Sequence, residues 1–155
     1  MYGVLIEYFR APDRATAVKA GRRGVAGSRR LDGFRAGIMP EVEMAELLAL
    51  AHDRPWSLDL LETEEIWPRR WIFRSRYDGP FIAELSASSG PQFASIPDHA
   101  VPGLVTRWAQ IEELSLDSYI AAGDYSRLEQ VAVAMIGLAR RAQEAGDHLY
   151  VRIAP

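Results

Sequence analysis

Three histidines of the chain each stand beside an aspartate, as His52-Asp53, Asp98-His99 and Asp147-His148. A histidine that is hydrogen-bonded to a carboxylate is a common component of general base catalysis and of metal sites. Adjacent residues, however, point to opposite faces of a strand and do not face each other on a helix. The spacing therefore predicts surface or helix-capping histidines. A small enzyme that uses His99 or His148 with a carboxylate stays open as an alternative, because sequence does not show which side chains meet in space.

Arginine and glycine dominate residues 21–35, where GRRGVAGSRRLDGFR holds five arginines and four glycines. The phosphate-loop pattern G-x-x-x-x-G-K-[ST] does not fit, because no lysine follows the glycines. The run GRRG matches the G-x-x-G loop of KH domains, but Gly27 stands where the helix after that loop would begin. We expect a solvated loop that docks on an acidic surface through Arg22, Arg23, Arg29 and Arg30. Nucleic-acid binding through residues 21–35 is the alternative.

A second basic stretch, IWPRRWIFRSRY, interleaves arginines with aromatic residues. Proteins that bind single-stranded nucleic acid need stacking platforms and phosphate contacts on one surface. Here the alternation places aromatic residues on one face and Arg74 and Arg76 on the other, which is typical of an amphipathic strand. Arg69 and Arg70 precede that strand and remain a candidate binding patch.

Charge is segregated along the chain. Residues 10–35 hold eight basic and two acidic residues, and residues 41–65 hold eight acidic and one basic. The acidic patch Glu62, Glu64 and Glu65 lacks the spaced D-x-[DN]-x-[DN]-G pattern of a calcium loop. We interpret it as a solvated acidic surface, and complementary blocks of this kind are expected to face each other partly.

Composition narrows the classes of function. The 155 residues are 48% apolar and 25% charged, with a net charge of −3, so nothing draws the whole chain to nucleic acid or to an anionic membrane. Cysteine is absent, which excludes disulfides, thiolate metal sites and a cysteine nucleophile. No apolar run approaches the ~20 residues that span a bilayer, and residues 1–10 lack the pattern of a signal peptide. We expect a cytoplasmic protein with no cofactor and no metal.

Hydrophobic periodicity predicts the elements that position these residues. Strands are expected at YGVLIEYF and HLYVRI, and a central hairpin at WIFRSRYDGPFIAELSA, in which Tyr77 opposes Phe81 and Arg74 opposes Glu84. Helices are expected at 40–52, 102–114 and 126–145, with Gly146 as the cap that ends the last one, and a weaker helix at 13–23. Residues 57–67 fit either a helix or a strand.

The two ends of the chain resemble the YfbM-like family of small uncharacterised bacterial proteins. The resemblance lies in the opening GVLIEYF, in IPDHAVPGLVTRWAQIEELS and the following long helix, and in the closing AQEAGDHLYVRIAP. The family's Leu-Asp-x-x-Trp-x-x-Leu-His element is represented only by Leu31-Asp32. The resemblance implies an α+β fold and carries no activity and no site residues with it.

These observations predict one α+β domain over residues 1–155. Its mixed or antiparallel sheet, made of the terminal strands and the central hairpin, is covered by three to four helices. We expect a non-catalytic protein-interaction or regulatory module with segregated basic and acidic surfaces. Its partner would be another protein or a second copy of the chain, in preference to nucleic acid.

Overall fold

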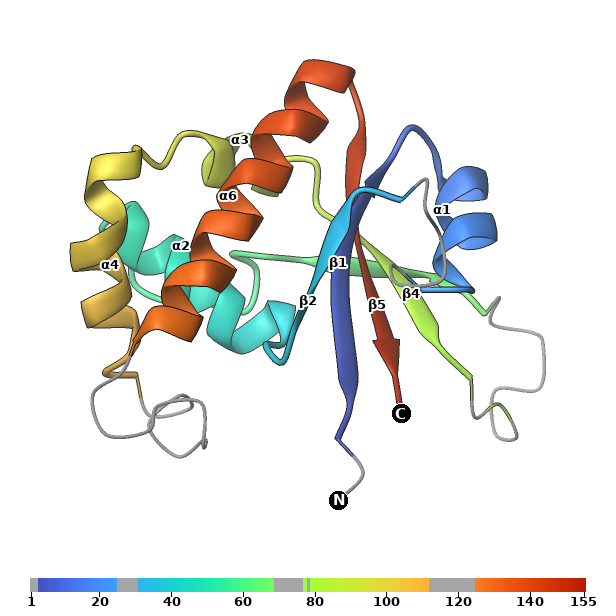
Figure 1. Ribbon diagram of the computed structural model, residues 1–155, viewed down its shortest axis with the longest axis horizontal. Helices are drawn as coiled ribbons and strands as arrows, with labels where there is room; N and C mark the ends of the chain where they lie inside the picture. Colours follow the sequence, from blue (N-terminus) through green and yellow to red (C-terminus); the bar gives the residue numbers. More distant parts are fainter. Residues whose placement is uncertain (1–2, 25–30, 69–76, 78, 112–124) are drawn as a thin grey trace.

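The computed structural model describes residues 3–24, 31–68, 77, 79–111 and 125–155 of the chain. Five strands form one sheet in the order β2-β1-β5-β4-β3, and every pair is antiparallel. The strands are β1 (Leu5–Ala11), β2 (Gly33–Ala36), β3 (Thr63–Trp67), β4 (Phe81–Leu85) and β5 (His148–Ala154). The predicted α+β fold is confirmed, and the terminal strands β1 and β5 lie side by side (Figure 1).

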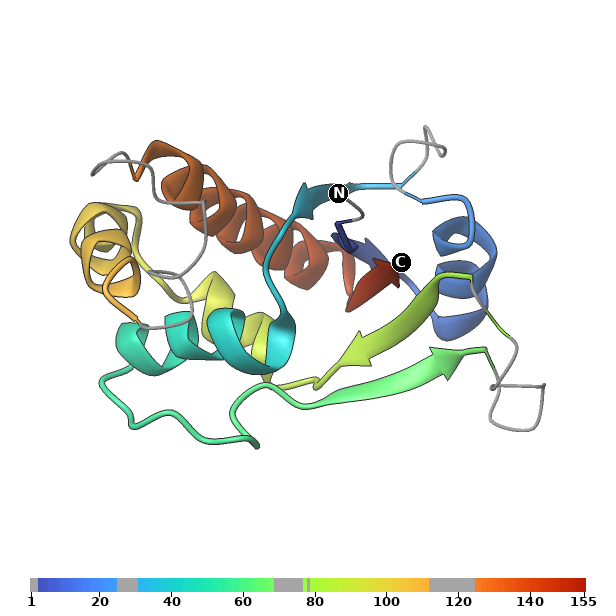
Figure 2. The ribbon, with the colours of Figure 1, turned by 90° about the horizontal axis from the view of Figure 1, so that it is seen from below.

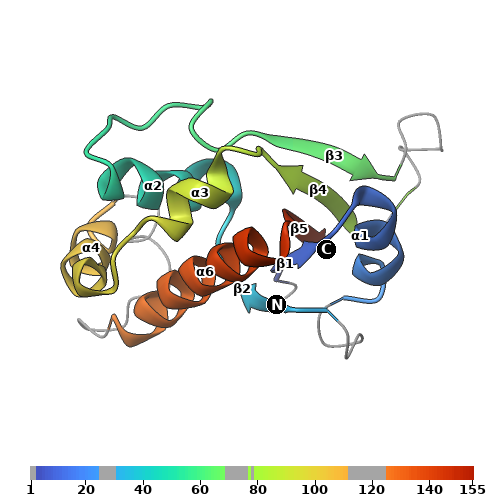
Figure 3. The same ribbon diagram turned by 90° about the horizontal axis from the view of Figure 1, so that it is seen from above.

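One face of the sheet carries the larger core. The long helix α6 (Ser126–Ala145) lies against this face, and α2 (Ala45–Ala51), α3 (Ser89–Ala94) and α4 (Val101–Trp108) pack on its side of the sheet (Figure 3). A π-helical turn (Pro40–Met44) leads into α2, and a short 3₁₀ turn (Asp98–Ala100) leads into α4. Ile6 and Tyr8 of β1 belong to this core, as does the fully buried Trp108.

The opposite face of the sheet is covered by the short helix α1 (Arg14–Gly21) (Figures 1 and 2). Successive residues of a strand point to opposite faces, so Phe9 and Ala11 leave the larger core and join Ile82, Tyr150 and Ala17 in a second, smaller one. Each face of the sheet therefore has a buried apolar cluster, and the cluster beneath α1 is the smaller one.

The long helix agrees with its prediction. It runs from Ser126 to Ala145, and Gly146 follows with φ +72°, the left-handed conformation that suits glycine at a helix end. An apolar stripe is buried along its length: Leu128, Val131, Met135, Leu138 and Ala142. None of the described helices is long and apolar enough to cross a membrane.

The predicted hairpin is wrong in its pairing. The partner of β4 is β3, and Glu84 stands opposite Glu64 and Tyr150 rather than Arg74. Tyr77 still meets Phe81, edge to face at 5.7 Å, and residues 69–76 lie outside the described part of the chain. The alternation of apolar and polar residues predicted a strand, but it did not predict which strand pairs with β4. The pairing with β3 places Ile66 and Trp67 in the smaller core beneath α1, and the sequence analysis did not predict this second core.

Four further outcomes concern the bounds and the types of the elements. The ambiguous stretch 57–67 contains a turn followed by β3, and α4 ends at Trp108 instead of residue 114, with 112–114 outside the described residues. The helix α3 occupies a segment for which no helix or strand was predicted. The expected solvated loop 21–35 is partly a strand, because β2 pairs with β1, where Phe34 lies opposite Tyr8 and their rings stack at 5.6 Å.

Candidate functional site

A cleft with a volume of about 1020 Å³ lies between α1 and the end of β3. Its lining divides into charged residues around an apolar floor. The charged residues are Arg14, Lys19, Arg22, Arg23 and Glu65. The floor is made of Ala15, Val18, Ile66, Trp67 and Pro68. We call this cleft the basic groove, because four of its five charged residues are cationic.

The GRRG run contains the last residue of α1 and the turn that follows it. Its glycines pack against the sheet, and its arginines face the solvent. Gly21 faces the sheet so closely that a Cβ there would lie 2.9 Å from both Ile82 and Phe9. Gly24, at φ +77°, lies over the side chain of Glu7. The two glycines are buried and the two arginines between them are exposed. The spacing of the glycines therefore reflects close packing on the sheet, and it presents Arg22 and Arg23 to the groove.

Trp67 is the aromatic part of the floor, and its position is fixed. Its indole Nε1 donates to the hydroxyl of Tyr77 at 3.1 Å, and that hydroxyl donates to the carbonyl of Pro80 at 2.9 Å. The guanidinium carbon of Arg22 lies 4.7 Å from the centroid of the indole ring. A cation at this distance over a tryptophan face is attracted by the ring quadrupole.

Arg14, at the other end of the groove, is neutralised by the protein itself. Its Nη2 lies 2.6 Å from Glu64 and its Nε lies 2.6 Å from Glu84. The hydrogen bonds to Glu64 and Glu84 raise the pKa of Arg14 above its ordinary value. In contrast, Lys19, Arg22 and Arg23 form no ion pair with any carboxylate in the described part of the chain.

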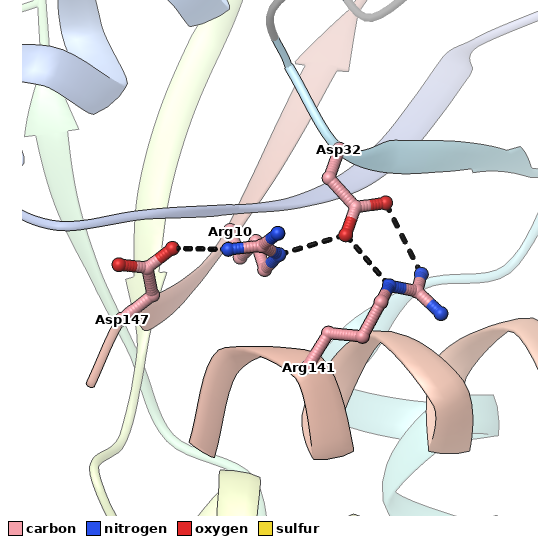
Figure 4. Close-up of polar contacts among 4 residues, drawn as sticks. All are labelled: Arg10, Asp32, Arg141 and Asp147. Carbon is pink, nitrogen blue, oxygen red and sulfur yellow. Dashed lines mark hydrogen bonds and ion pairs between the residues drawn. The ribbon is translucent and has the colours of Figure 1, made fainter. Parts of the chain in front are cut away.

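A second group of charges lies at the C-terminal end of α6, where Arg10, Asp32, Arg141 and Asp147 form a chain of contacts (Figure 4). Asp32 accepts from Arg10 and Arg141, each at 2.7 Å, and Asp147 accepts from Arg10 at 2.7 Å. The hydrogen bond from Arg141, followed by that from Arg10, holds the pKa of Asp32 below its ordinary value. Each charge is matched, so this network ties β1, β5, α6 and the start of β2 together and leaves no cation for a ligand.

The histidines do not converge on one site. Each neighbouring aspartate contacts an arginine of another element instead: Asp53 with Arg107, Asp98 with Arg140, and Asp147 with Arg10. His52 contacts the carbonyl of Gln92, His99 is exposed, and Nδ1 of His148 lies 3.6 Å from Glu84. Among the described residues, no group of three or more histidine, aspartate and glutamate side chains could hold a metal ion.

The groove brings together some of the predicted binding residues. Arg22 and Arg23 line it, whereas Arg29, Arg30, Arg69 and Arg70 lie outside the described residues. In the acidic patch, Glu64 binds Arg14, Glu65 lines the groove and Glu62 is exposed. The predicted meeting of basic and acidic blocks therefore occurs at Arg14.

Sequence reasoning missed Lys19 and Trp67. The spacing of Lys19, Arg22 and Arg23 is i, i+3, i+4, which places three cations on one side of a helix end. That spacing was available in the sequence, but the position of Trp67 depends on the unexpected β3–β4 pairing.

No family model, curated protein or solved structure matches the chain. The resemblance to the YfbM-like family therefore stays a prediction.

Proposed function

We propose that this protein is a non-catalytic interaction module that binds an acidic segment of a partner protein in the basic groove. The observation that carries the proposal is the charge of Lys19, Arg22 and Arg23 above an apolar floor, which no carboxylate among the described residues matches. Arginines elsewhere, such as Arg10, Arg140 and Arg152, are paired with carboxylates of the same chain. Cations that the fold does not match are available to a ligand.

The floor of the groove favours a polypeptide over a small ion. Val18 and Ile66 are half-buried, and Pro68 lies beside them. A segment that carries both carboxylates and aliphatic side chains would match the charged residues and cover this apolar surface at once. Complementary charge of this kind speeds association and selects partners.

Nucleic acid is the second candidate, because the groove combines cations with an aromatic ring. Single-strand binding proteins leave the aromatic face open for a base to stack on. Here Arg22 lies over the ring of Trp67. This arrangement favours the acidic protein segment.

The test uses a fluorescein-labelled peptide of alternating glutamate pairs and leucines, with a lysine-for-glutamate version and an oligothymidylate as competitors. Fluorescence anisotropy at low and moderate salt measures affinity. We expect the acidic peptide alone to bind, and the double reversal Lys19→Glu with Arg23→Glu to weaken it at least tenfold, roughly 1.4 kcal/mol. The matched control is Arg54→Glu, an exposed arginine that does not line the groove.

Two results would contradict the proposal. Equal binding by the groove reversal and by Arg54→Glu would place the acidic ligand elsewhere. Stronger binding of the oligothymidylate, with affinity that falls steeply as salt rises, would indicate a nucleic-acid groove, because neutralised phosphates release counterions. Light scattering measures the mass of the protein in solution and shows whether it is a monomer or a dimer when the peptide is added.

A further inference from the structure

Arg22 differs from the other two unmatched cations of the basic groove. All three side chains are exposed, but among the described aromatic rings only Trp67 has one of them above it: the guanidinium of Arg22, 4.7 Å from the ring centroid. An arginine on a rigid aromatic face loses less side-chain freedom when it binds, because part of that freedom is already lost. Arg22 is therefore the best prepared of the three to bind a ligand.

The platform beneath Arg22 is itself rigid. The hydrogen-bond chain from Trp67 through Tyr77 to the carbonyl of Pro80 fixes the edge of the indole. The rest of Trp67 packs against the smaller core. Gly21, which precedes Arg22, fits so closely against Phe9 and Ile82 that the backbone on this side is also held in place.

The hydrogen-bonding capacity of Arg22 is unused. Its side chain donates no hydrogen bond to any residue that the structure describes, although a guanidinium carries five donors in a planar fork. That fork matches the two oxygens of a carboxylate, and the pairing is shorter and stronger than a neutral hydrogen bond. A carboxylate can therefore bind Arg22 while the guanidinium keeps its contact with Trp67.

We propose that Arg22, held on Trp67, is the specificity-determining residue of the basic groove, and that it selects a partner segment by one aspartate or glutamate side chain bound through two parallel hydrogen bonds. This inference rests on the proposed function and sharpens it. Lys19 and Arg23 contribute general attraction to acidic segments, whereas Arg22 fixes where one carboxylate must lie.

Two matched substitutions distinguish a specific role of Arg22 from general binding in the basic groove. Arg22→Lys and Arg23→Lys both keep the charge of the groove, and both affect an exposed side chain at the end of α1. A lysine ammonium is a point charge and cannot form the planar two-bond contact. We expect Arg22→Lys to weaken binding of the labelled glutamate–leucine peptide about tenfold, and Arg23→Lys to weaken it less than about twofold.

A second readout tests the role of the ring. In a Trp67→Leu background, the difference between arginine and lysine at position 22 is expected to shrink to less than about threefold, because the platform is gone. Circular dichroism shows whether that background is folded. If it is not, Tyr77→Phe, which removes the acceptor for the indole N–H, takes its place and is expected to reduce the same difference.

Each outcome decides one proposal. Equal losses for Arg22→Lys and Arg23→Lys would overturn the role of Arg22 and leave the groove selecting on net charge, so the proposed function would stand. An unchanged arginine–lysine difference after the ring is removed or released would also overturn it. No binding of the peptide by the wild-type protein would overturn both proposals together.

Discussion

The carboxylate of Glu7 lies 2.8 Å from Nη1 of Arg152, and the two side chains are only 2% and 12% exposed. They stand opposite each other in β1 and β5, on the face of the sheet that α1 covers. Gly24 lies over them, so close that a Cβ there would be 3.0 Å from the carboxylate oxygen of Glu7. The smaller core thus has a buried ion pair at its edge.

Removing one partner of this pair is expected to be costly. The substitution Arg152→Met keeps an unbranched apolar stem but removes the guanidinium that pairs with the buried Glu7, a type of change that costs about 3–5 kcal/mol. Arg35 is the matched control, because it stands opposite Glu7 from the other side, in β2, and is exposed. Arg35→Met is expected to change the free energy of unfolding by less than about 0.5 kcal/mol. Urea unfolding followed by circular dichroism measures both, and similar losses in the two variants would show that the pair is not special.

The two glycines Gly21 and Gly103 should respond oppositely to alanine. At Gly21 a Cβ would lie 2.9 Å from Ile82 and Phe9, so Gly21→Ala overpacks the contact between α1 and the sheet and is expected to cost about 1–3 kcal/mol. At Gly103, in α4, no described atom outside the neighbouring residues and the helix's own backbone lies within 4 Å of the added Cβ, and Gly103→Ala is expected to stabilise the helix by up to about 1 kcal/mol. Thermal unfolding gives the sign of each change, and a stabilised Gly21→Ala would show that α1 packs on the sheet more loosely than the 2.9 Å approach implies.

Asp32 is expected to make the stability depend on acid pH. Its pKa in the folded protein is lowered by the hydrogen bonds from Arg141 and Arg10, so its stabilising effect is fully present above the ordinary value of 3.8. As the pH falls from 3.8 through the lower folded-state pKa, the carboxylate is protonated and the stabilisation is lost.

The measurement compares wild type with Asp32→Asn in urea over a series of pH values. The difference in free energy of unfolding is expected to be constant near neutral pH and to shrink below 3.8. Asp53→Asn is the control, because the Asp53 side chain is 91% exposed and lies 3.9 Å from Arg107. A difference for Asp32→Asn that does not change with pH would show that this network acts through packing rather than through its charges.

The sequence predicted the parts of this fold that depend on local pattern. Helix α6 follows from its apolar stripe and from Gly146, and β1 and β5 follow from runs of apolar residues at the ends of the chain. The pairing of β4 with β3 was missed, because the alternation of apolar and polar residues in a strand shows which face is buried but not which strand lies beside it. For the same reason Trp67 was not expected beside Arg22. Their proximity depends on a helix and a strand that are far apart in the sequence and are held together by the smaller core.

The two most buried tyrosines offer a direct comparison of satisfied and unsatisfied hydroxyls. The hydroxyl of Tyr8 donates to the carbonyl of Ile38 at 2.7 Å, whereas the buried hydroxyl of Tyr150 has no hydrogen-bond partner among the described residues. Tyr8→Phe therefore leaves a buried carbonyl unpaired and is expected to cost about 1 kcal/mol. Tyr150→Phe removes a hydroxyl that gains nothing in the folded state, and it is expected to be neutral or stabilising.

The stability of the protein at alkaline pH tests the burial of the Tyr150 hydroxyl in a second way. Burial raises the pKa of Tyr150 to about 12 from an ordinary value of 10.0. Between these values the unfolded chain has lost a phenol proton that the folded protein retains, so stability falls as the pH rises. The wild type is therefore expected to lose more stability than Tyr150→Phe on going from pH 9 to 11 in urea unfolding, by an amount that grows above the ordinary value of 10.0. A loss near neutral pH in Tyr150→Phe, comparable with that of Tyr8→Phe, would mean that the Tyr150 hydroxyl is bonded after all.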